Sequence, residues 1–199
     1  MKIGYFGGTF NPIHLAHIHM AETYIHTLGL DKMILMPTYL PPHKSTEHLA
    51  DAEERITMCR LAVEGNETFS ICDFEVRQKG KSYTYRTLRH LCEQYPDSSL
   101  YMIMGGDMFL TVQNWEYAED IFRLATLCTA EREPGELAKL RVHRENLEKL
   151  GARCIITDMP AIPLSSTLIR RKLFAGEDVS ELLHPSVCRY IRERGLYRE

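Results

Sequence analysis

With 199 residues, of which 44% are hydrophobic and 26% charged, the chain can bury a sizeable core and has an ordinary globular composition. That composition excludes a disordered or fibrous protein. The formal net charge of -3 at pH 7 creates no long-range attraction for nucleic acid, so a phosphate ligand has to be held by local groups.

The first half of the chain alternates strand and helix patterns. Residues 2–6 (KIGYF) form a short apolar run that ends at Gly7 and Gly8, and residues 15–28 then repeat apolar side chains at helical spacing. The proline-rich stretch at 39–49 predicts a mobile loop. The other strand patterns lie at 32–37, 68–76 and 98–105, and the other helix patterns at 51–64 and 83–94.

The second half continues the alternation, with strand patterns at 125–130 and 153–158 and helix patterns at 134–150, 166–174 and 186–194. Such alternation predicts right-handed βαβ units, and therefore an α/β fold with a doubly wound, Rossmann-like parallel sheet. We expect a single domain over residues 1–199, with a short C-terminal helical part from about residue 163. Sheets of this kind bind ligands outside the carboxyl ends of their strands.

The turn after the first predicted strand has the features of an anion site. A strand, two glycines and a helix start leave backbone N–H groups without helical partners, and the helix dipole favours negative charge there. The sequence GGTFNPIHLAH at 7–17 matches neither G-x-G-x-x-G nor the Walker A pattern, which argues against a dinucleotide cofactor or a P-loop NTPase. Other side chains have to supply the phosphate chemistry.

His14 and His17 are three residues apart, so their rings should emerge on one side of the first helical turn. Two other interpretations stay open: one core and one surface histidine, or a metal site completed by His19. His19 lies about 200° around the helix from His17, which disfavours a shared ion. The six cysteines include no C-x-x-C pair, so we predict no protein metal site and reduced, mostly buried thiols.

A second unusual helix start lies in PLSSTLIRRKL at 163–173. Ser165 or Ser166 suits an N-cap, but the following turn carries arginines where acids are preferred. Hydroxyls, free N–H groups and a guanidinium together suit a phosphate, which an arginine can bind through two hydrogen bonds. The alternative is an ordinary capped surface helix with solvated arginines.

Together, GGTFNPIHLAH and LSSTLIR resemble the paired H-x-G-H and S-S-T-x-I-R signatures of a nucleotidyltransferase superfamily. Within it, PPHK at 41–44, SYT at 82–84, GGD at 105–107, the tryptophan eight residues beyond and the terminal YIRERGLY resemble the bacterial nicotinate-nucleotide adenylyltransferases. The resemblance runs in order from residue 2 to about residue 197. It implies their fold and their reaction: adenylyl transfer from ATP, with Mg²⁺, to nicotinate mononucleotide, giving deamido-NAD and pyrophosphate.

The resemblance also implies a role for each matching residue. The catalytic residues would be His14, His17 and Arg170. The ATP-binding residues would be Gly7, Gly8, Thr9, Phe10, Gly105, Asp107, Ser166 and Thr167. The residues around nicotinate mononucleotide would be Lys44, Arg55, Thr84 and Trp115, with the tryptophan stacked on the pyridine ring. The alternative for Trp115 is an ordinary core residue, and for Arg55 a surface helix residue.

The sequence departs from the family pattern at three positions. Ala16 stands where the signature usually has glycine, and its methyl group narrows the space for the α-phosphate. Gly106 replaces the more usual alanine, with no expected effect, and Arg86 stands where the family tends to have an acid, so it receives no role. Four alternatives stay open: the same chemistry on nicotinamide mononucleotide or on phosphopantetheine, a nucleotide-binding regulator without turnover, and a metallohydrolase.

The sequence also carries expectations about location and partners. It contains no run of about 18 apolar residues, and MKIGYFGG is too soon broken by glycine to be a secretory segment. We therefore expect a cytoplasmic protein that binds ATP and nicotinate mononucleotide and contacts neither membrane nor nucleic acid. Whether it forms a homo-oligomer is left open.

Overall fold

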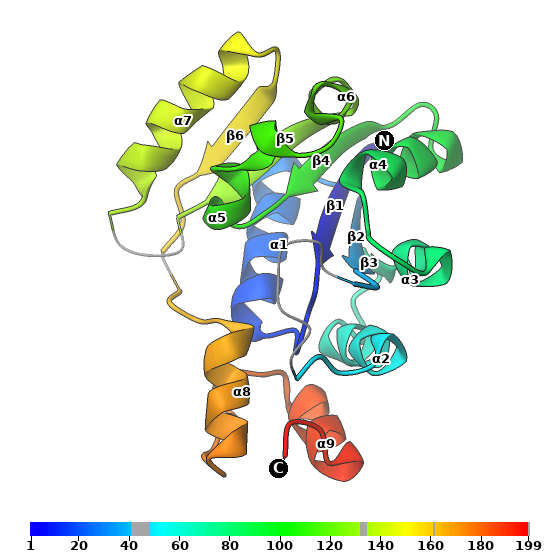
Figure 1. Cartoon of the computed structure of the whole chain (residues 1–199), viewed down its shortest axis with the longest axis vertical. Coiled ribbons are helices and arrows are strands. Elements are labelled where there is room, and N and C mark those ends of the chain that lie inside the picture. The colour runs from blue at the N-terminus through cyan, green and yellow to red at the C-terminus, as the bar shows by residue number, and fades with distance from the viewer. Residues whose placement is uncertain (41–47, 132–134, 161, 199) are drawn as a thin grey trace. The chain divides into compact units, whose positions relative to one another are not determined.

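A computed structural model of the whole chain describes residues 1–40, 48–131, 135–160 and 162–198. Within these residues the sheet has six strands, in the order β3-β2-β1-β4-β5-β6 (Figure 1). They are β1 (Lys2–Gly8), β2 (Lys32–Pro37), β3 (Phe69–Ile71), β4 (Ser99–Ile103), β5 (Ala125–Ala130) and β6 (Arg153–Thr157). The order runs outward from β1 to β3 and resumes on the other side of β1 with β4, which confirms the predicted doubly wound sheet.

The helical elements of the described residues are α1 (Leu15–Leu28), α2 (Ala52–Ala62), α3 (Phe74–Gln78), α4 (Thr84–Gln94), α5 (Gly106–Phe109), the 3-10 helix η1 (Val112–Asn114), α6 (Ala118–Leu124), α7 (Leu137–Lys149), α8 (Ser166–Phe174) and α9 (Pro185–Arg194). Every helix that the sequence predicted is present, with its ends shifted by a few residues at most. Among the residues described, none of these helices combines the length and the apolar character needed to cross a membrane. The predicted mobile loop at 39–49 falls mostly on residues 41–47, outside the described residues.

The predicted strand at 68–76 is wrong in its second half. β3 ends at Ile71, and Asp73 is the N-cap residue of the short helix α3. Phe74 and Val76 continue the apolar alternation in the sequence, but the backbone here is helical, with the Arg77 N–H donating to the Asp73 carbonyl at 2.9 Å. The Arg77 Nε also donates to Asp73 Oδ2 at 2.8 Å, as residues four apart on a helix can. Glu75 and Val76, which are adjacent in the chain, are both buried, so the apolar alternation does not correspond to one buried and one exposed face.

The apolar pattern predicted no helix or strand over residues 106–124, where α5, η1 and α6 lie. These elements have four, three and seven residues. A helical repeat of apolar side chains needs more than about two turns to stand out, so elements this short leave no periodic signal.

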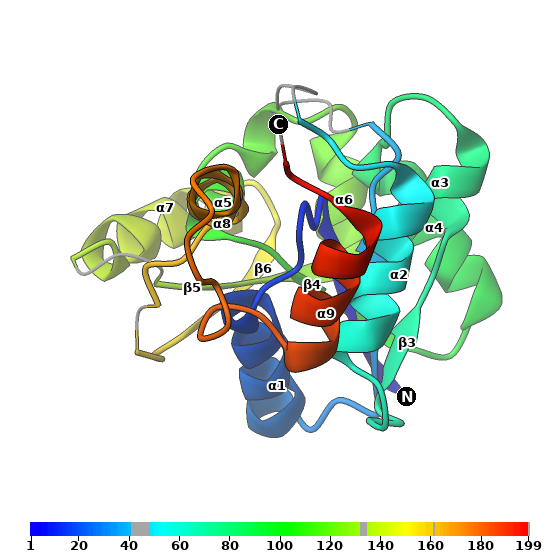
Figure 2. The same ribbon diagram turned by 90° about the horizontal axis from the view of Figure 1, so that it is seen from below.

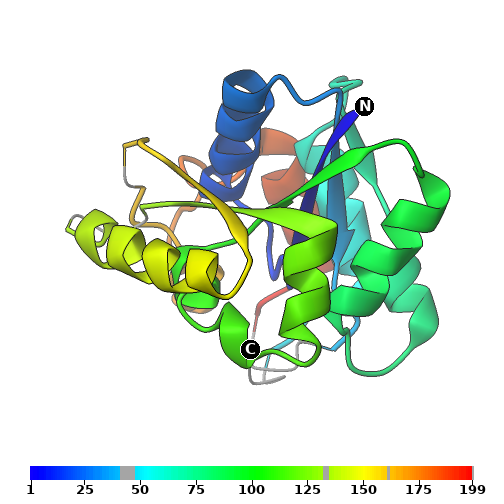
Figure 3. The ribbon, with the colours of Figure 1, turned by 90° about the horizontal axis from the view of Figure 1, so that it is seen from above.

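The chain divides into two compact units, each assembled from three stretches. The first comprises Met1–Gly7, Ala21–Ile34 and Tyr83–Pro163. In this unit β1, β4, β5 and β6 pair in parallel, so their carboxyl ends lie at one edge. Helix α7 packs along β6, and α6 packs against α4, as Figures 1 and 3 show from two sides.

The core of the first unit explains the near-continuous apolar runs of its strands. Ile3, Met102 and Leu127, from three different strands, are all buried. Parallel strands are usually covered on both faces, so their residues need not alternate between apolar and polar. The buried Tyr24 of α1 donates its hydroxyl to the carbonyl of Thr129 in β5, and burial raises the pKa of that hydroxyl.

The second unit comprises Gly8–Met20, Leu35–Ser82 and Leu164–Glu199. Here α2 and α9 lie side by side (Figures 1 and 2). Glu54 of α2 accepts hydrogen bonds from Tyr190 Oη at 2.5 Å and from Arg194 Nη2 at 2.7 Å, both from α9. The start of α1 is tied to the loop before α9, because the Leu15 N–H donates to the Leu182 carbonyl at 3.1 Å. This unit contains most of the two sequence signatures.

Candidate active site

The two predicted histidines lie at the start of α1. The His14 carbonyl accepts the first helical hydrogen bonds, from the N–H groups of His17 at 2.9 Å and Ile18 at 3.3 Å, so His14 occupies the N-cap position. The His14 and His17 rings stack with centroids 3.6 Å apart and planes 23° apart. The prediction that both rings share one side of the helix is confirmed. His14 is 5% exposed and His17 is half-buried, so burial alone leaves the alternative of one core and one surface histidine open.

A hydrogen bond within this turn selects the protonation of His17. The backbone N–H of His14 donates to His17 Nδ1 at 3.2 Å. Because Nδ1 is the acceptor, the proton of the neutral ring sits on Nε2, and the ring presents an N–H donor on that side. An N–H donor at the positive end of a helix dipole suits the oxygens of a phosphate.

The turn between β1 and α1 has a constrained backbone. Phe10 has a φ of 47°, in the left-handed region that a bulky residue rarely adopts. Its buried ring meets the ring of His17 edge-on, with centroids 5.1 Å apart. A Cβ at Gly8 would lie 3.0 Å from the Phe10 ring, so this glycine allows the close approach. The turn is thus packed around Phe10 and beneath His17.

Helix α8 brings the second signature to this turn. Ser165 is its N-cap, accepting from the Leu168 N–H at 3.1 Å, as the sequence predicted. Ser166 Oγ donates to the Pro12 carbonyl at 2.9 Å, and Arg170 Nη1 donates to the Asn11 carbonyl at 2.8 Å. The two motifs therefore lie against each other, although more than 150 residues separate them. Thr167, the neighbouring hydroxyl, is exposed.

Arg55 is buried inside the second unit, so the interpretation as a surface helix residue is wrong. Its side chain is 1% exposed. The guanidinium donates to four backbone carbonyls at 2.6–3.0 Å, those of Thr9, Thr38, Tyr39 and Ala50. Burial lowers the pKa of this guanidinium below its usual range. Arg55 ties the loop after β1 to the connection between β2 and α2. Its expected contact with nicotinate mononucleotide stays a prediction.

The remaining predicted residues lie in the first unit or outside the described residues. Phe6 of β1 is opposite Ile103 of β4, so Gly7 and Gly105 follow neighbouring strands at the point where the sheet order reverses. A Cβ at Gly105 would lie 2.8 Å from Asp107 Oδ1, so the carboxylate folds back over this turn. Lys44 lies outside the described residues.

The two residues expected at the pyridine ring are described in the first unit. Thr84 is the first residue of α4 and is half-buried. Trp115 follows the 3-10 helix η1 and is also half-buried, as many tryptophans are, so its stacking role stays a prediction. Part of each side chain is accessible, which the proposed substrate contacts require.

The turn between β1 and α1, residues 9–14, is called the signature turn below. Sequence reasoning missed two residues that the geometry places at this turn. Asn11 is 5% exposed and Tyr197 is 7% exposed. Tyr197 Oη donates to Asn11 Oδ1 at 2.6 Å across 186 residues. The terminal YIRERGLY motif was recognised as part of the family resemblance, but no local pattern links its tyrosine to an asparagine near the start.

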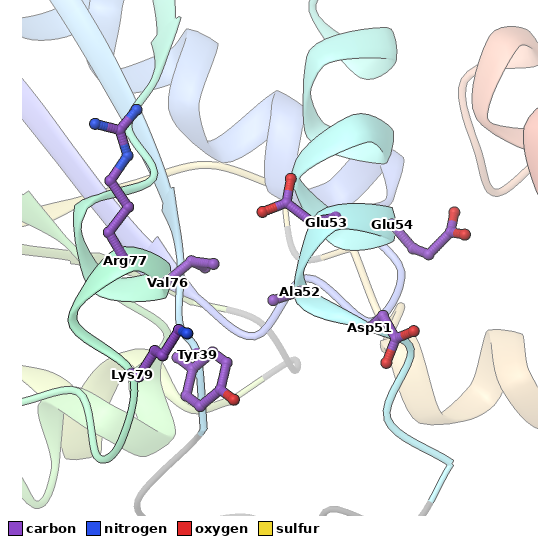
Figure 4. Close-up of a pocket in the computed structure, with 8 residues that line it drawn as sticks. All are labelled: Tyr39, Asp51, Ala52, Glu53, Glu54, Val76, Arg77 and Lys79. Atoms are coloured by element: carbon purple, nitrogen blue, oxygen red, sulfur yellow. The ribbon is translucent and has the colours of Figure 1, made fainter.

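A pocket of about 550 Å³ opens beside the start of α2 (Figure 4). Its lining residues are Tyr39, Asp51, Ala52, Glu53, Glu54, Val76, Arg77 and Lys79. None of these described residues is a predicted site residue. Two of the charged residues that line the pocket already form ion pairs, Glu54 with Arg194 and Arg77 with Asp73. The pocket therefore adds no residue to the candidate site.

The described residues contain no group of three or more His, Cys, Asp or Glu side chains placed to hold a metal ion. The donors that meet at the signature turn are hydroxyls, imidazoles and a guanidinium. These groups suit a polyanion rather than a cation.

This fold and site define a nucleotidyltransferase. The Cytidylyltransferase-like family model matches residues 5–172, a range that includes both signatures. A solved structure of Plasmodium falciparum nicotinic acid mononucleotide adenylyltransferase, complexed with NaAD, superimposes with a TM-score of 0.81. The match covers 98% of this chain and 97% of that one at 20% sequence identity, so it bears on the fold alone.

Two relatives narrow the family. A protein of Enterococcus faecalis named "Probable nicotinate-nucleotide adenylyltransferase" is 40% identical over all of this chain and 85% of its own. One of the same name from Synechococcus is 39% identical over 98% of this chain and 94% of its own. The chain belongs to the nicotinate-nucleotide adenylyltransferase family.

Proposed function

We propose that the protein transfers the adenylyl group of ATP to nicotinate mononucleotide, giving deamido-NAD and pyrophosphate. The observation that carries the proposal is the junction of the two signatures: Ser166 and Arg170 of α8 are hydrogen-bonded to the turn that leads into the stacked histidines. The donors that this junction offers to a triphosphate are the imidazoles and the guanidinium N–H groups that do not bond to Asn11.

The reaction needs no protein nucleophile. A phosphate oxygen of the mononucleotide attacks the α-phosphorus in line and forms the new O–P bond, while the bond to the β-phosphate oxygen breaks and its electron pair leaves with pyrophosphate. The protein contributes positioning and charge stabilisation. His17 would donate its Nε2 proton in a hydrogen bond to the α-phosphate as negative charge builds there, and His14 would contact the same phosphates.

Helix α8 and the turn between β1 and α1 would bind the leaving pyrophosphate. Ser166, Thr167 and Arg170 would bind the β- and γ-phosphates, and the backbone from Gly7 to Phe10 would line the same site. Lys44 would reach the phosphates from its loop. Mg²⁺ would arrive with ATP and would neutralise charge on the leaving pyrophosphate.

The family resemblance assigns the two nucleoside ends to Asp107, Thr84 and Trp115. Asp107 would accept hydrogen bonds from ribose hydroxyls of ATP, beside the Gly105 turn. Trp115 would stack on the pyridine ring, and Thr84 would donate to the ring carboxylate. Backbone N–H groups near Trp115 and Glu116 would donate to the same carboxylate. Because an N–H cannot accept a hydrogen bond, these contacts would favour the acid over the amide, whose NH₂ would face another donor. The free cysteines fit a reducing compartment, in line with the cytoplasmic location that we propose.

The test is pyrophosphate release with ATP, Mg²⁺ and each mononucleotide in turn. We expect much faster release with nicotinate mononucleotide; equal or reversed rates would remove the acid preference. His17→Ala should lower kcat by about 100-fold or more, the range expected for a group that acts in the transition state. His19→Ala, on the other side of the same helix, is the matched control. No turnover with either mononucleotide, despite ATP binding, would favour the nucleotide-binding regulator.

A further inference from the structure

Asn11 joins four segments of the second unit. Its side-chain Oδ1 accepts from Tyr197 Oη at 2.6 Å and from the Ala50 N–H at 3.0 Å, and its Nδ2 donates to the His48 carbonyl at 3.0 Å. Its backbone carbonyl accepts from Arg170 Nη1 at 2.8 Å. A buried asparagine with this many good partners has one preferred orientation, because any rotation leaves buried polar groups unpaired.

Tyr197 reaches this junction from the end of the chain. Helix α9 stops at Gly195, whose φ of 62° lets the chain turn, and the Leu196 N–H donates back to the Ile191 carbonyl at 3.0 Å. The turn delivers the Tyr197 ring into the core, where it is 7% exposed. Burial raises the pKa of the hydroxyl, so it remains an O–H donor at physiological pH.

Arg170 depends on this junction for its direction. Its bond to the Asn11 carbonyl at 2.8 Å is short, whereas its contact with Thr167 Oγ1 is 3.5 Å long. The shorter bond dominates, because hydrogen bonds weaken steeply towards 3.5 Å. Where the Asn11 carbonyl points therefore decides where the guanidinium lies.

We propose that Asn11 and Tyr197 are positioning residues for adenylyl transfer. The Tyr197 hydroxyl fixes the Asn11 amide, and Asn11 fixes both the Arg170 guanidinium and the turn that enters the histidines. This inference rests on the proposed function, in which Arg170 binds the leaving phosphates. It adds that a tyrosine near the end of the chain sets the geometry of the phosphate site through a single asparagine.

The first experiment compares two hydroxyl deletions. Tyr197→Phe removes the bond to Asn11, and Tyr190→Phe, the matched control, removes the bond of another α9-region tyrosine to Glu54. We expect Tyr197→Phe to lower kcat by about 10-fold with a smaller change in KM for ATP, and Tyr190→Phe to change kcat by less than about twofold. Equal kcat values for Tyr197→Phe and the wild type would overturn the proposal.

A double-mutant cycle separates positioning from a general loss of structure. If Tyr197 acts through Arg170, then Tyr197→Phe should change kcat by less than about twofold once Arg170→Ala is present, although it lowers kcat about 10-fold alone. Equal fold-changes in both backgrounds would mean that Tyr197 acts independently of Arg170 and would overturn the proposal. Circular dichroism and Tm of each variant verify that it is folded.

Two further measurements apply if the wild type shows no turnover or if Tyr197→Phe does not fold. If the wild type shows no turnover, the proposed function fails, and the same cycle is then measured as the Kd for ATP: a Tyr197→Phe effect that disappears in the Arg170→Ala background supports positioning, and one that persists contradicts it. If Tyr197→Phe does not fold, Asn11→Ala replaces it. That variant removes the acceptor of Tyr197 and Ala50 and keeps the backbone carbonyl that accepts from Arg170, so an unchanged kcat would contradict the proposal.

Discussion

Ser166 Oγ lies 2.9 Å from the carbonyl oxygen of Pro12, 154 residues earlier in the chain. The adjacent Ser165 hydroxyl does different work, because it caps α8 by accepting from the Leu168 N–H. The two neighbouring serines therefore have different roles. Ser165 stabilises the helix, and Ser166 attaches the helix to the signature turn.

Replacing each serine by alanine should separate these effects. Ser165→Ala should cost about 1 kcal/mol of unfolding free energy, the usual value of an N-cap, with kinetics within about twofold of the wild type. Ser166→Ala should cost about as much, the value of one hydrogen bond, but should also raise KM for ATP about 10-fold, because α8 loses its bond to the turn. Urea unfolding and steady-state kinetics measure both. Identical kinetic changes in the two variants would contradict the assignment.

Arg55 should be among the residues that the fold tolerates least. Arg55→Met leaves the carbonyls of Thr9, Thr38, Tyr39 and Ala50 without their donor, and burial prevents water from replacing it easily. We expect a loss on the order of 3 kcal/mol in unfolding free energy. Arg55→Lys should recover only part of it, since an ammonium cannot span the fork of a guanidinium. A stability within about 0.5 kcal/mol of the wild type would show that the carbonyls find other partners.

The long elements of the fold could be predicted because hydrophobic periodicity records burial directly. Helices α1, α4 and α8 each contain two or more turns, so their apolar side chains repeat often enough to be recognised. The region 106–124 lacks that repetition. Helix α3 was missed because its apolar residues alternate as they would in a strand. Where elements are shorter than about two turns, capping and contacts distant in sequence decide the structure instead.

The candidate site divides in the same way. His14, His17, Ser166 and Arg170 could be found because each belongs to a short motif whose spacing has a chemical meaning. Tyr197 could not, since its bond to Asn11 crosses 186 residues and leaves no local trace. For Arg55, an arginine on a helix looks solvated in the sequence, and only the four carbonyls gathered by folding explain its burial.

Glu54 should make the stability of the second unit depend on pH. Its hydrogen bonds from Arg194 and Tyr190 hold the pKa of this carboxyl below its usual range. A carboxyl whose pKa is lower in the folded state stabilises the fold above its unfolded pKa, near 4.3 for glutamate, and loses this effect as pH falls through the folded pKa. Chemical unfolding between about pH 6 and pH 3 should therefore show a smaller pH dependence in Glu54→Gln.

Glu53→Gln is the control for that measurement, because Glu53 lies on the same helical turn and outside the group formed by Glu54, Tyr190 and Arg194. It should leave the pH dependence close to that of the wild type. If both variants follow the wild-type curve, the interaction between Glu54 and α9 contributes nothing measurable in solution, as happens for many exposed ion pairs.

Gly106 tests whether a departure from the family pattern is as neutral as the sequence suggests. A Cβ at this position would lie 2.6 Å from Glu136 Oε1, so alanine requires the carboxylate to move. Against that, alanine favours a helix over glycine by about 0.8–1 kcal/mol, and Gly106 is the first residue of α5. We expect the two effects to offset each other in Gly106→Ala, leaving the unfolding free energy within about 0.5 kcal/mol of the wild type.

In a Glu136→Ala background the clash is absent, and the same substitution should then stabilise the protein by about 0.5–1 kcal/mol. Equal effects of Gly106→Ala in both backgrounds would show that the Glu136 carboxylate is not what makes glycine suit this turn.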